Sequence, residues 1–163
     1  MTKRITISTL DAMKASGDKF VMITAYDATF ARLASEAGAE TILVGDSLGM
    51  VLQGHETTIP VSLDAMTYHT ECVARARPHS LIVADLPFMS FSNADDTLHA
   101  STRLMQAGAQ MVKLEGGTWL SDSIHRLVER GVPVCAHLGL TPQSVNVFGG
   151  YRVQGRTPKE AKS

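Results

Sequence analysis

The sequence lacks an excess of charge of either sign. Its 163 residues include 15 Lys and Arg against 16 Asp and Glu, so the formal net charge is −1 at pH 7. Proteins that bind nucleic acid or an anionic membrane surface usually carry a basic patch, and this balance argues against both partners. Hydrophobic residues make up 44% and charged residues 19%, which is typical of a globular domain and excludes a disordered chain.

Long apolar runs and cysteines are also scarce. No apolar run approaches the roughly 18 residues that a membrane-spanning helix needs. The basic start of the chain is not followed by the apolar stretch of a secretory signal. Cys72 and Cys135 lie in apolar segments without CxxC spacing, which predicts buried free thiols and neither a disulfide framework nor a zinc site. We therefore expect a cytoplasmic protein.

The sequence does contain a regular alternation of short apolar runs with longer helical segments. The apolar runs, which predict strands, cover residues 20–26, 41–45, 80–84, 110–114 and 133–137. Helices are expected over residues 8–16, 28–37, 62–77, 94–107 and 119–130. Continuous apolar runs suit strands that are buried on both faces, so the pattern predicts an α/β fold with a parallel sheet. No repeat, linker or low-complexity segment divides the chain, and we expect one domain over residues 1–163.

Two architectures fit this alternation, an open doubly wound sheet and a (β/α)₈ barrel. The glycine-rich motifs GxGxxG and GxxxxGK[ST] of the common nucleotide-binding sheets are missing. A complete barrel, on the other hand, typically needs about 250 residues and eight strands. Composition and periodicity leave both architectures open.

Polar side chains gather at the carboxyl ends of the predicted strands. They are Asp46 and Ser47 after the second run, Asp85 after the third, Lys113 and Glu115 at the fourth, and His137 at the end of the fifth. Because the carboxyl ends of parallel strands open onto one face, we expect these side chains to converge there. Carboxylate oxygens are hard ligands, and three of them favour Mg²⁺.

Each of these residues also has a purely structural interpretation. A single Asp after a strand is most often a helix cap or a turn residue. Lys113 lies inside an apolar strand and needs an anionic partner, which could be Glu115. His137 alone would more often be a hydrogen-bonded core histidine.

One short motif suggests different chemistry. Gly45-Asp46-Ser47-Leu48 matches the tetrapeptide of the GDSL esterases, with Ser47 as the nucleophile. The Asp-x-x-His that such enzymes need occurs twice, at Asp96 to His99 and at Asp122 to His125, but both lie within predicted helices. The block that completes the oxyanion hole is absent, so four matching letters carry little weight.

The most specific signal is a series of longer stretches in order. They cover residues 24–27, 44–50, 53–55, 84–89, 112–117, 137–145, 148–151 and 153–156. Through these stretches the chain resembles the ketopantoate hydroxymethyltransferase (3-methyl-2-oxobutanoate hydroxymethyltransferase) family. The resemblance implies a (β/α)₈ TIM barrel, usually oligomeric, that needs Mg²⁺. It implies transfer of a one-carbon unit from 5,10-methylenetetrahydrofolate to 3-methyl-2-oxobutanoate, which gives 2-dehydropantoate in pantothenate biosynthesis.

The resemblance also assigns roles to the strand-end residues. Asp46, Asp85 and Glu115 match the metal site of the family. Asp46, Ser47, Asp85 and Lys113 match the contacts to the oxo acid, and His137 lines the pocket. The residue types suit a Mg²⁺-bound enolate, because the metal polarises the 2-oxo group as a Lewis acid and Lys113 neutralises the substrate carboxylate.

One part of the family pattern is not matched. The family's general base is a Glu from a later strand, and Glu160 follows no predicted strand and does not match it. We therefore expect a barrel truncated after about five βα units, with two open sheet edges, that is not a stable active monomer. Two alternatives remain: a non-catalytic fragment that binds Mg²⁺ and oxo acid or only assembles with other chains, and a Mg²⁺-dependent oxo-acid enzyme of the phosphoenolpyruvate mutase and isocitrate lyase kind, which needs no folate.

Overall fold

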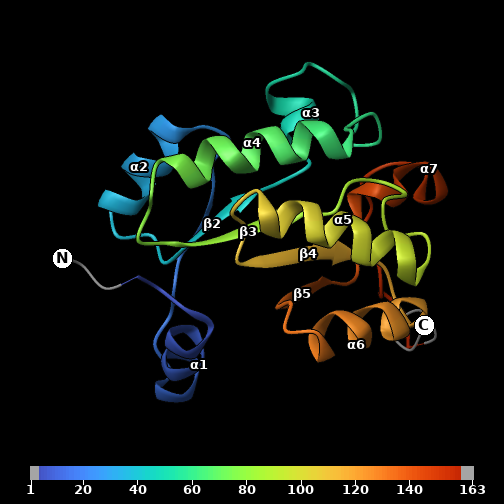
Figure 1. Ribbon diagram of the computed structural model, residues 1–163. Helices are drawn as coiled ribbons and strands as arrows, with labels where there is room; N and C mark the ends of the chain where they lie inside the picture. The colour runs from blue at the N-terminus through green and yellow to red at the C-terminus, as the bar shows by residue number, and fades with distance from the viewer. Residues whose placement is uncertain (1–3, 159–163) are drawn as a thin grey trace.

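The computed structural model describes residues 4–158, which form a five-stranded parallel sheet with helices between successive strands (Figure 1). The strands are β1 (Met22–Thr24), β2 (Thr41–Val44), β3 (Leu81–Asp85), β4 (Met111–Glu115) and β5 (Val134–His137). Their order in the sheet is their order in the chain, and every pairing is parallel. A doubly wound sheet reverses its strand order at a switch point, whereas a barrel adds each strand beside the last. The strand order therefore confirms the barrel-type prediction.

The helices support the same conclusion. The longer ones are α1 (Ile7–Ser16), α2 (Ala28–Glu36), α4 (Leu63–Arg75), α5 (Ala94–Gln106) and α6 (Ser121–Glu129). From α2 onward each of them contacts the next, α2 with α4, α4 with α5 and α5 with α6, and together they cover one face of the sheet (Figure 1). Crossovers that all return on one face are the arrangement of a (β/α) barrel. No helix within residues 4–158 is long and apolar enough to cross a membrane.

Local capping explains why the helix boundaries were predictable. Ser62 Oγ accepts from the backbone N–H of Ala65 at 3.1 Å, and Asn93 Oδ1 accepts from that of Asp96 at 2.9 Å. Gly108 ends α5 with a φ of 114°, and a Cβ on it would lie 2.4 Å from that of Ala74. The Ser62 and Asn93 caps and the left-handed conformation of Gly108 act within a few residues of the helix ends, so the predicted and observed ends differ by at most two residues.

Short elements were not foreseen. They are α3 (Leu48–Val51), η1 (Thr118–Leu120), η2 (Pro142–Ser144) and α7 (Val145–Phe148). The helix expected over residues 119–130 begins as the 3₁₀ turn η1. The strand expected over residues 20–26 is only three residues long.

One face of the sheet packs against the helices, and the other carries the polar side chains at the strand ends. Side chains alternate along a strand, so Ile82 and Ala84 of β3 join the core beneath the helices while Asp85 points to the opposite face. The register pairs Asp85 with Lys113, and Glu115 with His137. These four side chains therefore share the face away from the helices, at its carboxyl edge.

Candidate functional site

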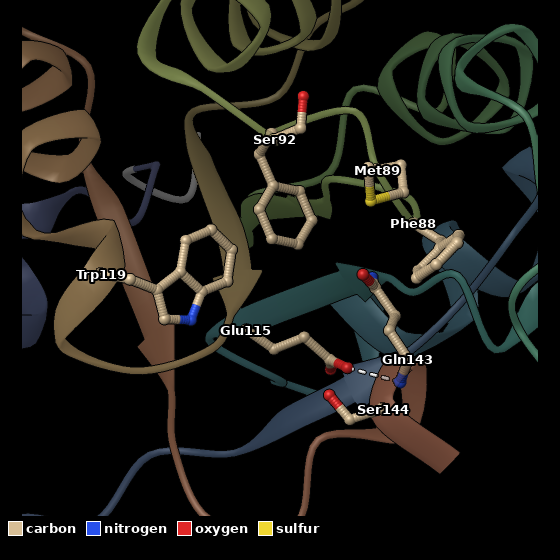
Figure 2. Close-up of a pocket in the computed structure, with 8 residues that line it drawn as sticks. Phe88, Met89, Ser92, Glu115, Trp119, Gln143 and Ser144 are labelled. Carbon is tan, nitrogen blue, oxygen red and sulfur yellow. Dashed lines mark hydrogen bonds between the residues drawn. The ribbon is translucent and has the colours of Figure 1, made fainter. Parts of the chain in front are cut away.

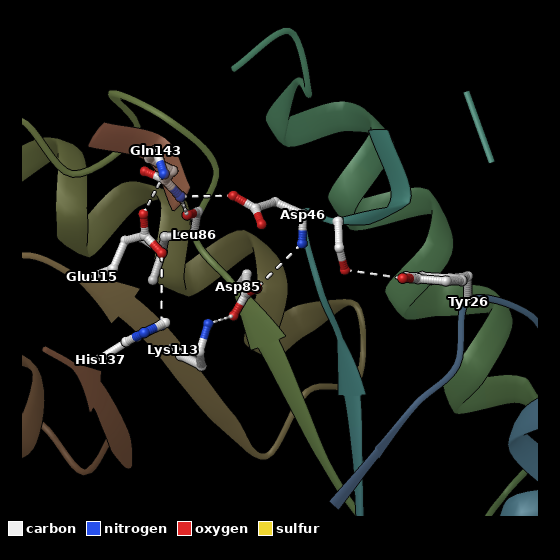
Figure 3. A network of polar contacts seen from close by, with 9 residues as sticks. Tyr26, Asp46, Asp85, Leu86, Lys113, Glu115, His137 and Gln143 are labelled. Carbon is white, nitrogen blue, oxygen red and sulfur yellow. Dashed lines mark hydrogen bonds and ion pairs between the residues drawn. The ribbon is translucent and has the colours of Figure 1, made fainter. Parts of the chain in front are cut away.

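The structure brings the strand-end residues together at one edge of the sheet (Figure 3). Asp85, Glu115 and His137 end β3, β4 and β5, and Asp46 follows β2 by two residues. The three acidic residues are buried, with 5% or 6% of their surface exposed. Residues that are far apart in the sequence thus form one polar cluster, the strand-end cluster.

Asp85 holds three strands together within this cluster. Its Oδ1 accepts from Lys113 Nζ at 2.7 Å, and its Oδ2 accepts from the backbone N–H of Asp46 at 3.2 Å. The sequence suggested Glu115 as the partner of Lys113. The structure shows that the partner is Asp85. Asp85 lies directly opposite Lys113 on the neighbouring strand, closer than a residue two positions along the same strand can lie.

Burial shifts the pKa values of Asp85 and Lys113 in opposite directions. Burial raises the pKa of Asp85, and the Lys113 ammonium only partly opposes that effect. Burial alone would lower the pKa of Lys113, but Asp85, Asp46 and Glu115 outweigh it, so the pKa is raised. Lys113 thus remains an ammonium group in contact with an acidic site.

Gln143, which the sequence analysis did not single out, connects the other two carboxyl groups. Its Nε2 donates to Asp46 Oδ2 at 2.8 Å and to the Leu86 carbonyl at 3.0 Å. Its backbone N–H donates to Glu115 Oε1 at 2.6 Å. The 3₁₀ turn η2 places this buried residue above the end of the sheet, and the only sequence signal for it was its place in the stretch 137–145.

The cluster contains three carboxyl groups and one ammonium group. Burial, and then the neighbouring Asp85, raise the pKa of Asp46 to about 6, although the Gln143 hydrogen bond opposes them. Burial raises the pKa of Glu115 to about 7 against the hydrogen bond from the Gln143 backbone. Such carboxyl groups favour a bound cation, which stabilises their ionised forms.

His137 and Ser47 lie at the sides of the cluster. His137 Nδ1 is 3.7 Å from Glu115 Oε2, and burial followed by the Lys113 charge lowers the pKa of His137, so its imidazole is neutral at pH 7. Ser47 Oγ and the Tyr26 hydroxyl share a hydrogen bond of 2.9 Å. Tyr26 was within a stretch of the family resemblance but had been given no role.

The esterase interpretation is wrong, because neither Asp-x-x-His pair serves Ser47. Asp96 accepts hydrogen bonds from Ser92 and Asn93 at the start of α5. On α6, Asp122 pairs with Arg126, and His125 with Glu129. The described hydrogen bond of the Ser47 hydroxyl goes to Tyr26. Glu160, the other carboxyl group weighed as a catalytic residue, lies outside the described residues.

The donor set fits a magnesium ion that is shared with a ligand. Within residues 4–158, no group of three His, Cys, Asp or Glu side chains forms a complete metal site. Mg²⁺ usually binds one or two protein carboxylates and takes its other ligands from water and substrate. Asp46 and Asp85 lie side by side, because Asp85 Oδ2 accepts a hydrogen bond from the Asp46 backbone N–H. Their carboxyl groups are hard oxygen donors of the kind that Mg²⁺ prefers.

A cavity of about 120 Å³ opens beside Glu115 and Gln143 (Figure 2). The remaining walls are mainly apolar and come from Phe88, Met89, Phe91, Ser92, Trp119 and Ser144. The rings of Phe91 and Trp119 are stacked, with centroids 6.1 Å apart and an interplanar angle of 14°. Polar and apolar parts of one site thus meet at Glu115 and Gln143.

Comparison with known proteins connects this site to a family. The family model of ketopantoate hydroxymethyltransferase matches residues 4–163. The chain belongs to the ketopantoate hydroxymethyltransferase family. It is 60% identical over 159 residues to 3-methyl-2-oxobutanoate hydroxymethyltransferase of Marinobacter nauticus, covering 98% of this chain and 60% of that protein. It is 61% identical over 153 residues to the Burkholderia vietnamiensis protein of the same name, covering 94% of this chain and 56% of that protein.

These two ketopantoate hydroxymethyltransferases show that the chain spans less than two thirds of the length of its curated relatives. Solved structures share its fold at lower identity. They include phosphonopyruvate hydrolase in complex with oxalate and Mg²⁺, with a TM-score of 0.66 and 17% identity over 94% of this chain and 65% of that one. A 2,3-dimethylmalate lyase of the PEP mutase/isocitrate lyase superfamily gives a TM-score of 0.62 and 16% identity over 87% of this chain and 54% of that one. The fold is shared with that superfamily, and sequence assigns the chain to the ketopantoate hydroxymethyltransferase family.

Proposed function

We propose that this chain supplies the metal-binding and oxo-acid-binding part of a 3-methyl-2-oxobutanoate hydroxymethyltransferase. The reaction transfers a one-carbon unit from 5,10-methylenetetrahydrofolate to 3-methyl-2-oxobutanoate and gives 2-dehydropantoate, a step of pantothenate biosynthesis. The observation that carries the proposal is the strand-end cluster, in which Asp46, Asp85 and Glu115 surround one ammonium group in a chain of this family.

Lys113 and Ser47 would bind the oxo acid. The Lys113 ammonium is held by Asp85, and its side chain is 16% exposed, so it can neutralise a substrate carboxylate that enters the site. Ser47 would orient the acid with a hydrogen bond, and Tyr26 fixes the position of its hydroxyl. His137, neutral at pH 7, would line the pocket without adding charge.

Asp46 and Asp85 would hold Mg²⁺, and Glu115, the third carboxyl group expected at the metal, would add negative charge nearby, because the three do not form a complete metal site in the described residues. When bound, the metal supplies Lewis-acid polarisation of the 2-oxo group, which makes the proton on C3 of the acid easier to remove. Gln143 would keep the Asp46 and Glu115 carboxyl groups at a fixed separation, because its side chain binds one and its backbone the other. We assign no residue of this chain as the general base that takes the C3 proton.

That missing assignment favours a narrower second candidate. In it, the chain binds Mg²⁺ and the oxo acid without completing the transfer. The residues to which we assign binding lie in the described part of the chain, and both candidates use them in the same way. They differ only in proton removal from C3 and in the formation of 2-dehydropantoate.

We include self-association and a cytoplasmic location in the proposal. Phe20, Val21 and Met22 at the β1 edge are 41–57% exposed, and burying them against another copy would stabilise an oligomer. Both cysteines are free thiols, as expected in a reducing compartment, but they are half-buried and not buried as the sequence predicted. Light scattering of the purified chain tests the first point, and a monomeric mass at micromolar concentration would contradict it.

The decisive experiment for the function follows the C3 proton. The purified chain is incubated with 3-methyl-2-oxobutanoate in D₂O, with and without Mg²⁺ and tetrahydrofolate, and the exchange is read by proton NMR. Formation of 2-dehydropantoate from 5,10-methylenetetrahydrofolate is measured in parallel. Mg²⁺-dependent binding together with exchange and product supports the transferase. Binding without either supports the second candidate, and the absence of binding contradicts both.

A further inference from the structure

The apolar cavity beside the strand-end cluster has no role in the function proposed so far. It measures about 120 Å³ and lies where the loops after β3 and β4 meet η2 (Figure 2). Glu115 and Gln143 line it and also belong to the strand-end cluster. A ligand held at the cluster therefore has this cavity next to it.

The wall of the cavity keeps large apolar side chains at the surface. Phe88 is 41% exposed, Met89 61% and Trp119 62%, whereas Phe91 behind them is buried. Three exposed apolar side chains around one hollow favour a ligand that covers them. Trp119 gains further rigidity because its ring is stacked on Phe91.

The backbone supports the same conclusion independently. Met89 has a φ of 61°, in the left-handed region that a long side chain rarely adopts. Ser90 holds this turn in place, since its backbone N–H and its hydroxyl both donate to the Pro87 carbonyl, at 3.0 and 2.7 Å. Strain that the structure maintains in this way is typical of ligand sites, and here it places Met89 on the cavity wall.

The volume of the cavity indicates which part of the proposed reactants it can hold. A dry cavity of about 150 Å³ holds a single benzene ring. A volume of about 120 Å³ thus suits a branched alkyl group of a few carbons. The mainly apolar lining fits the same group, because an alkyl chain brings no polar atom that needs a partner.

We propose that this cavity binds the branched alkyl end of the 2-oxo acid, and that Phe88, Phe91 and Trp119 determine which chain length is accepted. The proposal rests on the function proposed above, because it needs the carboxylate end of the acid to lie near Lys113. With the acid anchored there, Glu115 and Gln143 form the boundary between its polar and apolar ends. A methyl group in place of isopropyl leaves the cavity partly empty, and a longer chain meets Phe91.

Trp119 is the only tryptophan of the chain, so its fluorescence reports directly on this cavity. The chain is titrated in the presence of Mg²⁺ with pyruvate, 2-oxobutanoate, 3-methyl-2-oxobutanoate and 4-methyl-2-oxopentanoate. Calorimetry gives the affinities, and Trp119 emission shows whether the ligand reaches the cavity. Pocket contacts discriminate about 10-fold or more per methylene group, so we expect 3-methyl-2-oxobutanoate to bind at least about 10-fold more tightly than pyruvate. Its binding should also shift the Trp119 emission.

The variants Phe91→Leu and Phe88→Ala enlarge the cavity at a buried and at a half-exposed position. Both should move the preference toward 4-methyl-2-oxopentanoate by several-fold while pyruvate affinity changes little. Phe30→Ala is the matched control, because Phe30 is 64% exposed on α2 and does not line the cavity. Phe88→Ala keeps the test valid if Phe91→Leu fails to fold.

Three results would overturn the inference. If all four acids bind but no variant changes their order, the cavity does not determine chain length and only this inference fails. If tetrahydrofolate shifts the Trp119 emission and the acids do not, the cavity serves the one-carbon donor. If no acid binds with Mg²⁺ present, the proposed function fails, and the inference that rests on it fails too.

Discussion

Strands β3 and β1 are built from similar residues and have opposite environments. All five residues of β3 are buried, and Ile82 is 0% exposed, whereas all three residues of β1 are exposed, with Ile23 at 44%. Strand β3 lies between β2 and β4, while β1 pairs only with β2 in the described part of the chain. A strand with two neighbours can hold a buried charge in place, and the residue at the end of β3 is Asp85. The site is therefore built on the most firmly held part of the sheet.

The largest effect should come from breaking the ion pair that β3 makes with β4. Lys113→Met leaves the Asp85 carboxylate without its ammonium partner, and removing one member of a buried pair costs about 3–5 kcal/mol. Arg75→Met breaks an exposed pair with Glu71 and should cost less than about 1 kcal/mol. Urea unfolding at pH 8 measures both losses. Equal losses would show that the strand-end cluster is as solvated as the helix surface.

Removing an apolar side chain from each strand tests the comparison directly. Ile82→Ala should lower the free energy of unfolding by about 2–5 kcal/mol, because it leaves a cavity in the core. Ile23→Ala removes a side chain that is already half exposed and should cost about 1 kcal/mol or less. Similar values for the two variants, from the same unfolding curves, would mean that β1 is buried in solution.

The same contrast explains how much the sequence could predict. Helix ends depend on caps such as Ser62 and Asn93, which act within three residues, so they were predicted closely. The strand expected over residues 20–26 is shorter because an apolar run forms a long strand only where neighbours pair along its whole length. Short elements such as α3 and η2 contain too few residues to show a periodic pattern.

The sequence predicted that the side chains at the strand ends would converge. It did not predict which of them would contact each other. Parallel strands bring Asp85 and Glu115 to one edge in any register. The choice of Asp85 as the partner of Lys113 depends on the register between β3 and β4, which no local pattern encodes. Gln143 reaches Asp46 across 97 positions of sequence, a distance at which composition and spacing carry no information.

The strand-end carboxyl groups should make stability depend on pH. The pKa of Asp46 rises from 3.8 to about 6 in the folded state, and that of Glu115 from 4.5 to about 7. The folded state therefore binds more protons than the unfolded state, and stability should fall as the pH rises from about 4 to about 7. One pKa unit corresponds to about 1.4 kcal/mol, so each of these two pKa changes corresponds to roughly 3 kcal/mol, and the two together set an upper limit of roughly 6 kcal/mol for the fall.

Unfolding curves at several pH values, with and without Mg²⁺, test this. Asp46→Asn should reduce the fall, and Mg²⁺ should oppose it by binding the ionised carboxylates. A free energy of unfolding that rises between pH 4 and pH 7 would contradict the burial argument for these groups.

The smallest effect is expected on the β1 side of the site. Ser47→Ala removes one neutral hydrogen bond, worth about 0.5–1.5 kcal/mol, together with the contact to Tyr26. Affinity for the oxo acid should therefore drop by no more than about 10-fold, as measured by calorimetry with Mg²⁺ present. Complete loss of binding in Ser47→Ala would contradict this prediction. It would show that the β1 side of the site contributes as much to binding as the β3 side.

The central claim is that the carboxylates at the ends of the central strands bind the oxo acid together with a divalent cation. It is tested most directly by calorimetric titration of 3-methyl-2-oxobutanoate into the chain, with Mg²⁺ and with EDTA. Asp85→Asn and Asp46→Asn are compared with Asp64→Asn, whose side chain is 83% exposed on α4. We predict Mg²⁺-dependent binding in the parent chain and in Asp64→Asn, weakened at least about 10-fold in the other two, because each loses a charged group at the cation. Binding that persists in EDTA, or that Asp85→Asn leaves unchanged, would contradict the account.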